Sequence, residues 1–248
     1  MNRLQRLQIY YLGAGYSHEE AGRPYVWESK GWKIGFVNYV HPDTNPKVLE
    51  SAKIYANTFK MSSILESIRN LNAEVDKVVV LLHWGGKCDY GYFPHQEQIV
   101  QAKAMVDAGA DVLIGHHTHT FQSTLTYKGK PIYFSLGNFC FADIHSDGNV
   151  YVVRNSGRKS GVVNITFSDQ EDVEHNVIPI WLDGLKPKPA SKPMFDRWNV
   201  LFNLVRFVPF GYSFYYYLLR RVEPVNYHAQ LNGISMTQLF INKMNRII

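Results

Sequence analysis

Two aliphatic runs separated by a helical stretch place the strongest constraint on how this chain folds. Lys77–Leu82 and Asp111–Ile114 are almost continuously apolar, the pattern of strands buried on both faces of a parallel sheet. Between them we expect a helix over His95–Ala108, with Gly109 in the position of a C-terminal glycine cap. Such strand–helix–strand crossovers are nearly always parallel and right-handed. The sequence therefore predicts an α/β fold.

Further strands and one more helix are expected around this unit. Val26–Glu28 and Lys33–Tyr39 flank a Ser-Lys-Gly turn and are expected to form a hairpin. Phe59–Asn72 carries apolar residues at helical spacing. Gly161–Phe167 and Val173–Ile180 alternate apolar and polar residues, which predicts antiparallel strands.

Four histidines follow the two buried strands at the point where each strand ends. His83 follows the first strand, and His116, His117 and His119 follow the second. Loops after parallel strands emerge at one edge of the sheet, where α/β proteins place their sites. Imidazole is the commonest metal-binding side chain, and two histidines two positions apart in an extended loop can face one ion. The sequence predicts a metal site here, with unliganded surface histidines as the alternative.

Length and charge bound the possibilities more loosely. At 248 residues the chain can form one large domain, or one domain with an appendage. The net charge of +5 permits an anionic partner without requiring one. Cys88 and Cys140 are too few for a disulfide framework and are expected as free thiols, although one bridge is an alternative.

Three motifs around the histidines are specific enough to carry a resemblance. They are LHWG at 82–85, DAGADVLIGHHTH at 107–119 and YKGKPIYFSLGNF at 127–139. They closely resemble the CapA/PgsA family of capsule and poly-γ-glutamate synthesis proteins, over about residues 4–140. The resemblance implies a four-layer α/β/β/α metallophosphoesterase-like sandwich with two metal ions between the loops. In such a centre the ions clamp a phosphate and activate a bridging water.

The resemblance also implies roles for individual residues. His83, His117 and His119 match metal-binding histidines of the family, for divalent ions such as Mn, Zn or Fe. His116 is implied to support them or to donate a proton. From its position in the loop after His83, Asp89 is the carboxylate expected nearest the site and the candidate general base.

Some residues near the motifs admit other interpretations. Asn138, in the GNF turn, is expected to stabilise backbone rather than bind metal. Cys88 lies close enough in sequence to His83 for a Cys–His nucleophilic pair, a weaker alternative. Lys87 stands where the family commonly has an acid.

The N-terminal family motifs do not occur before Leu12. The family's Gly-Asp, Asn-x-Glu and Asn-His-x-x-Asp motifs supply most of the remaining ligands. We therefore expect an N-terminally truncated sandwich with an incomplete metal site, either a fragment of a longer protein or a divergent short chain of impaired activity.

The composition changes near residue 183. We expect a metallophosphoesterase-like domain over 1–182, a Pro- and Lys-rich linker over 183–193, and an aromatic helical extension over 194–248. The extension is too short and too interrupted to span a bilayer. Its aromatics are expected to pack against the domain, with the membrane interface as the alternative.

Two functions follow as expectations. The first is a metal-dependent phosphoesterase-type hydrolase in capsule or poly-γ-glutamate synthesis or export. Its partners would be an anionic polymer or phosphoester substrate and other polymer-synthesis proteins. The second is a non-catalytic accessory or scaffold component that docks on membrane or partner through the extension. No nucleic-acid partner is expected. The sequence shows no signal peptide, so a complete chain would be cytoplasmic or peripherally membrane-bound.

Overall fold

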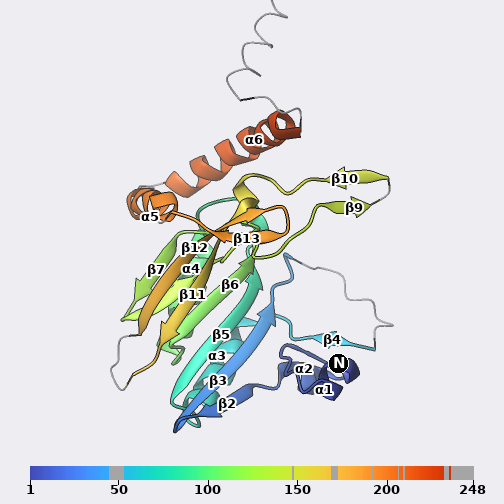
Figure 1. The fold of residues 1–248 in the computed structure, drawn as a ribbon. Helices are drawn as coiled ribbons and strands as arrows, with labels where there is room; N and C mark the ends of the chain where they lie inside the picture. Colours follow the sequence, from blue (N-terminus) through green and yellow to red (C-terminus); the bar gives the residue numbers. More distant parts are fainter. Residues whose placement is uncertain are drawn as a thin grey trace, which may run out of the picture.

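A six-stranded sheet lies at the centre of the molecule (Figure 1). Its strands, in spatial order, are β2 (Tyr25–Ser29), β3 (Trp32–Val40), β5 (Lys77–Trp84), β6 (Val112–His117), β8 (Lys130–Tyr133) and β7 (Thr124–Tyr127). The structure is a computed structural model that describes residues 1–44, 53–146, 148–168, 173–191, 193–205, 207–208, 210–231 and 235.

The inner strands of this sheet run in parallel, as the crossover pattern predicts. β3 pairs with β5, β5 with β6, and β6 with β8, all in parallel, whereas β2 and β7 add antiparallel edges. Most of β5 is buried, and Val78 and Val80 have no exposed surface. A strand covered on both faces explains its unbroken aliphatic sequence.

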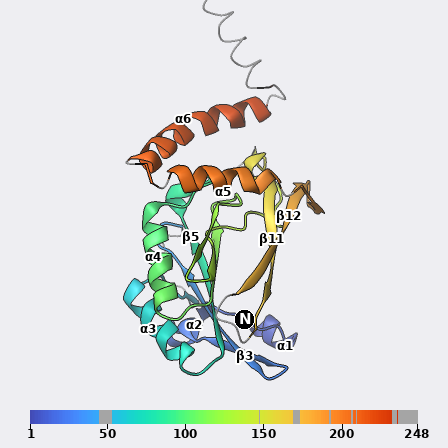
Figure 2. The same cartoon turned by 90° about the vertical axis from the view of Figure 1, so that its left-hand side faces the viewer.

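Two helices cover one face of the sheet, α3 (Met61–Asn72) and α4 (Gln96–Asp107) (Figure 2). Ile64 and Ile68 of α3 and Met105 of α4 are fully buried in the main core. Burial of such a side chain contributes about 1.5–3 kcal/mol. Gly109 follows α4 with a φ of 115°, a backbone conformation that glycine adopts without strain.

A second, three-stranded sheet packs on the opposite face (Figure 2). It consists of β11 (Lys159–Thr166), β12 (Glu174–Asp183) and β13 (Lys186–Pro189), all antiparallel. Its Ile165 packs both on the central sheet and against Phe121 and Tyr133. A layer of helices and two packed sheets confirm the α/β sandwich expected from the sequence, and the described residues form three of its four expected layers.

Short elements complete the domain. They are α1 (Asn2–Arg6), β1 (Ala14–Gly15), α2 (His18–Gly22), β4 (Tyr55–Ala56), β9 (Ile144–Ser146), β10 (Asn149–Tyr151) and two 3₁₀ turns, η1 (Gly86–Cys88) and η2 (Ser156–Arg158). β1 pairs with β4 and β9 with β10, each antiparallel.

The stretch expected as a linker is partly a strand. Lys186–Pro189 forms β13, which among the described strands pairs with β12 alone, at the edge of its sheet. An edge strand tolerates proline because one side of it needs no hydrogen-bond donors. The division of the chain at 183–193 stays a prediction.

Two C-terminal helices follow, α5 (Pro193–Val205) and α6 (Gly211–Leu231), and of the residues after α6 the structure describes Ser235 alone. Several of their aromatics pack on the domain. The rings of Trp198 and Tyr92 stack at 4.1 Å, and the backbone N–H of Tyr92 donates to the Tyr215 hydroxyl at 2.8 Å. Tyr216 donates to the Phe93 carbonyl.

Other aromatics, between α5 and α6 and on α6 itself, face solvent. Phe207, Phe210 and Phe214 expose 76%, 85% and 63% of their surface. Among the described helices, none is both long and apolar enough to cross a membrane. Contact of this exposed surface with a membrane interface stays a prediction.

Candidate functional site: a histidine edge

The ends of β5 and β6 bring the predicted histidines to one edge of the central sheet. In the parallel register His83 lies beside His116, and Trp84 lies beside His117. His119 follows two residues after the end of β6. The topology therefore gathers residues that are 34 positions apart in sequence, as the crossover predicts.

His83 and His117 contact each other directly. Nε2 of His83 lies 3.0 Å from Nδ1 of His117, and the two rings meet edge to face at 4.7 Å. On its other side, Nε2 of His117 lies 3.2 Å from Oδ1 of Asp89. The structure thus joins the predicted carboxylate to a predicted ligand in one chain of polar contacts.

His119 lies nearby but has a different partner. Its ring centroid is 6.0 Å from that of His117. Its Nδ1 is 2.9 Å from Oδ1 of Asn138, and its ring stacks on Tyr90 at 5.6 Å. His119, the third predicted ligand, therefore lies beside His83 and His117, and its Nδ1 faces Asn138 in the turn after β8.

The backbone at this edge adopts a conformation that is unusual for residues other than glycine. The φ angles of His117 and His119 are 110° and 58°, and that of Tyr90 is 59°. Conformations of this kind cost about 1–3 kcal/mol each and persist where the surroundings enforce them. Thr118, between the histidines, is fully buried, and its carbonyl accepts from the N–H of Tyr90 at 2.8 Å.

The imidazoles influence one another electrostatically. Partial burial of the ring, followed by the neighbouring His117, His116 and His119, lowers the pKa of His83, and Asp43 opposes this shift. Burial also lowers the pKa of His116. Both shifts favour the neutral ring, the form that offers a nitrogen lone pair to an electrophile.

His41 and Asp43 belong to this edge, and sequence reasoning missed them. His41 follows β3, the parallel neighbour of β5, and its N–H donates to the carbonyl of His83 at 2.8 Å. Its Nδ1 lies 2.7 Å from Oδ1 of Asp43. The rule that loops after parallel strands share an edge places them here once the parallel pairing of β3 with β5 is known.

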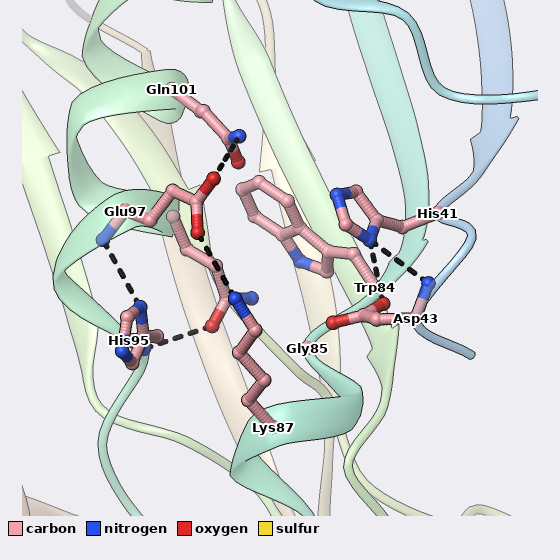
Figure 3. Close-up of a pocket in the computed structure, with 9 residues that line it drawn as sticks. His41, Asp43, Trp84, Gly85, Lys87, His95, Glu97 and Gln101 are labelled. Atoms are coloured by element: carbon pink, nitrogen blue, oxygen red, sulfur yellow. Dashed lines mark hydrogen bonds and ion pairs between the residues drawn. The ribbon is translucent and has the colours of Figure 1, made fainter.

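A small polar cavity opens beside these residues (Figure 3). His41, Asp43 and Trp84 lie on one side and His95 and Glu97 on the other, around a volume of about 20 Å³. Gln98 also lines it and is buried, and its Nε2 has no partner within the described structure. The volume suits one water molecule, which would satisfy this amide.

Cys88 is not a nucleophile of this site. The thiol is fully buried, donates to Oε1 of Gln98 at 3.5 Å, and burial raises its pKa to about 11. A thiol in this state holds its proton at neutral pH. The Cys–His alternative therefore has no support in the geometry.

A family model described as "Bacterial capsule synthesis protein PGA_cap" matches residues 1–143, more than half of the chain. The chain belongs to the PGA_cap family. The match covers every residue of the histidine edge described above and ends before β11.

Two curated relatives support the PGA_cap membership. The capsule biosynthesis protein CapA of Bacillus anthracis is 37% identical over 119 residues, 48% of this chain and 26% of that protein. The PGA biosynthesis protein CapA of Bacillus subtilis strain 168 is 27% identical over 205 residues, 82% of this chain and 50% of that protein. The chain therefore spans half or less of the length of each of these two relatives.

A solved structure of low sequence identity is also similar. The 5'-nucleotidase precursor of Thermus thermophilus has a TM-score of 0.42 and 17% identity to this PGA_cap chain. The alignment covers 82% of this chain and 39% of that one.

The donor atoms of this PGA_cap chain fit a metal ion in part. Two nitrogens bound to one ion at about 2.1 Å lie about 3.0–3.4 Å apart. The 3.0 Å between His83 and His117 fits this spacing and equally fits a hydrogen bond between the two rings. Across the part of the chain that the structure describes, no group of three or more His, Cys, Asp or Glu is arranged to hold an ion. The structure therefore offers two convergent nitrogens, with His119 and Asp89 nearby.

Proposed function

We propose that this chain is a metal-dependent phosphoesterase-type protein of capsule or poly-γ-glutamate synthesis. The histidine edge would be its reaction site. The relatives' names supply the biological context, because both describe proteins of capsule or PGA biosynthesis. The geometry of the edge supplies the chemistry.

One observation carries the proposal. Nε2 of His83 and Nδ1 of His117 approach to 3.0 Å at the carboxyl ends of two parallel strands, where α/β proteins bind their ligands. His83, His117 and, through its Nε2, His119 would hold a divalent ion such as Mn, Zn or Fe. Such an ion supplies Lewis acidity toward a phosphoryl oxygen.

The remaining residues would position the site and move protons. Asp89 contacts Nε2 of His117 and would fix the orientation of that ring, as carboxylates do for metal-binding histidines. His116 lies beside His83 in the strand register, and its lowered pKa favours the neutral ring. It would serve as the proton relay.

Metal binding by matched variants tests the proposal. Co²⁺ absorption and Zn²⁺ or Mn²⁺ calorimetry would compare the wild type with His83→Gln, His117→Gln and Asp89→Asn. Loss of a ligand should abolish or greatly weaken binding, and loss of Asp89 should weaken it about 10–100-fold. His145→Gln, an exposed histidine of β9, is the matched control and should bind as the wild type does.

Hydrolysis of bis-p-nitrophenyl phosphate is the second measurement. Activity that requires added metal and falls in the His83 and His117 variants would support the enzyme. A wild-type chain that binds none of these metals, or binds them equally after both substitutions, would overturn the metal site.

The second candidate is a non-catalytic accessory component of the polymer-synthesis machinery. Its support is the exposed aromatic surface of Phe207, Phe210 and Phe214 on and before α6. Co-sedimentation with phosphatidylglycerol vesicles would test membrane docking. We expect binding by the wild type and loss in a variant with all three residues changed to serine. A chain that binds vesicles but neither metal nor phosphodiester would favour this candidate over the enzyme.

A further inference from the structure

A second and larger cavity lies between α6 and the start of α4. Its volume is about 520 Å³. Lys87 and His95 line it on the side of the domain, and Tyr216, Tyr217, Arg220 and Arg221 line it on the side of α6. Lys87 and His95 also line the small cavity of Figure 3, so the two spaces are neighbours.

The walls of this cavity are held in place by specific contacts. Tyr216 donates to the Phe93 carbonyl, and its ring lies 6.4 Å from that of His95. Gly91 lets α6 approach closely, because a Cβ there would lie only 3.1 Å from the Tyr216 ring. The cavity is therefore built by packing between the helix and the loop after β5.

Its charge is of one sign. Lys87, Arg220 and Arg221 bring three positive charges, and none of the residues described as lining it is a carboxylate. Glu97 lies outside the lining and pairs with Lys87 at 3.5 Å, between two exposed side chains, where such a pair contributes little. Arg221 stacks over the Tyr217 ring at 3.6 Å, which orders its guanidinium.

Backbone polarity adds to this charge. His95 is the N-cap of α4, and Gln96, the first residue of the helix, also lines the cavity. The N-terminus of a helix carries partial positive charge, which the capping box of α4 reduces here because the Glu97 N–H donates to the His95 side chain. The cations and the helix end together favour an anionic occupant.

We propose that this cavity binds a polyanion, a chain that carries repeated carboxylate or phosphate groups. One inorganic anion would fill only a small part of 520 Å³. A flexible chain can present anions to Lys87 and to the arginines of α6 at the same time. The cavity is then a binding subsite beside the histidine edge.

Binding of defined polyanions to the full chain tests this inference. Fluorescent poly-L-glutamate and polyphosphate of matched charge would be titrated against the wild type and the Arg220→Gln/Arg221→Gln variant. Loss of two surface ion pairs should weaken binding about tenfold. Lys87→Gln, on the opposite wall, should weaken binding in the same direction. Preference for one polymer identifies carboxylate or phosphate as the recognised group.

The control is the Arg3→Gln/Arg6→Gln variant, which removes the same charge from α1 at the far end of the molecule (Figure 1). It should bind as the wild type does. Equal weakening in the control, unchanged binding in both cavity variants, or binding only to phosphatidylglycerol vesicles would overturn the inference. His83→Gln should retain polyanion binding, so this result is independent of the metal site.

Discussion

Oδ1 of Asn138 lies 2.9 Å from Nδ1 of His119, and Nδ2 of the same side chain donates to the Gly157 carbonyl at 3.0 Å. The turn after β8 thus holds a histidine of the loop after β6. A proton on Nδ1 of His119 satisfies the amide oxygen and leaves Nε2 with its lone pair. The asparagine sets which nitrogen of His119 is available to a ligand.

Asn138→Ala should therefore lower stability and disturb His119 together. The side chain is buried, and its loss leaves the Gly157 carbonyl without this donor, at a cost of about 1–3 kcal/mol. Urea unfolding followed by circular dichroism measures the change. Asn164→Ala, at an exposed position of β11, should stay within about 0.5 kcal/mol of the wild type. Equal effects of the two substitutions would contradict the role of Asn138.

The lowered pKa of His83 predicts that acid weakens the fold. The unfolded chain takes up a proton at this residue near the ordinary value of 6.5, whereas the folded chain does so only at lower pH. The contribution of His83 to the free energy of unfolding should be fully present above pH 6.5. It should be lost as the pH falls from there through the folded pKa. Urea titrations at several pH values measure this slope.

The His83→Gln variant provides the comparison for the pH dependence. It lacks the titrating ring, so its free energy of unfolding should fall less steeply between neutral and acidic pH. A variant that loses stability with acid as steeply as the wild type would show that other groups cause the effect.

The two cysteines should differ sharply in reactivity. Cys88 is buried, with a pKa raised to about 11, whereas Cys140 is exposed. A thiol-reactive disulfide such as DTNB at a pH of about 8 should titrate one thiol in the folded chain and two after denaturation. Cys140→Ser should remove the fast reaction and Cys88→Ser should preserve it. Rapid reaction of two thiols in the folded chain would contradict the burial of Cys88.

Gly115→Ala should be among the most damaging single substitutions in the central sheet. A Cβ at Gly115 would lie 2.0 Å from the Phe134 carbonyl oxygen and 2.5 Å from Nε1 of Trp84, which donates to that carbonyl at 3.0 Å. Overpacking of this kind costs about 1–3 kcal/mol or more. Gly22→Ala in α2, where a Cβ meets nothing closer than 3.6 Å, is the control. Thermal unfolding of both variants distinguishes them.

Local pattern was sufficient to predict the elements that carry the site. The aliphatic run of β5 and the helical spacing in α4 are properties of short segments, and the parallel rule then brought His83 to His117. The parallel placement of β3 beside β5 is a tertiary relationship. His41 and Asp43 were missed because only that relationship puts them at the same edge.

Local sequence pattern also could not predict which residue each histidine of the site contacts. Spacing predicted that His117 and His119 face one ion, which stays a prediction. It could not show that Nδ1 of His117 lies against His83 and Nδ1 of His119 against Asn138. Asn138 was expected to stabilise backbone, which it does through Gly157 while it also contacts the histidine. Local pattern could not predict β13, because an edge strand and a linker tolerate the same Pro- and Lys-rich sequence.

The backbone at position 117 has a φ of 110°, which favours glycine for stability, whereas the site requires a histidine there. Glycine adopts this conformation at almost no cost, whereas a side chain with a Cβ is strained there. A chain selected only to fold would place glycine at 117, and a chain that must present an imidazole to His83 carries the strain. His117→Gly should therefore have a higher free energy of unfolding than His117→Ala. Both variants lack the imidazole nitrogen that faces His83.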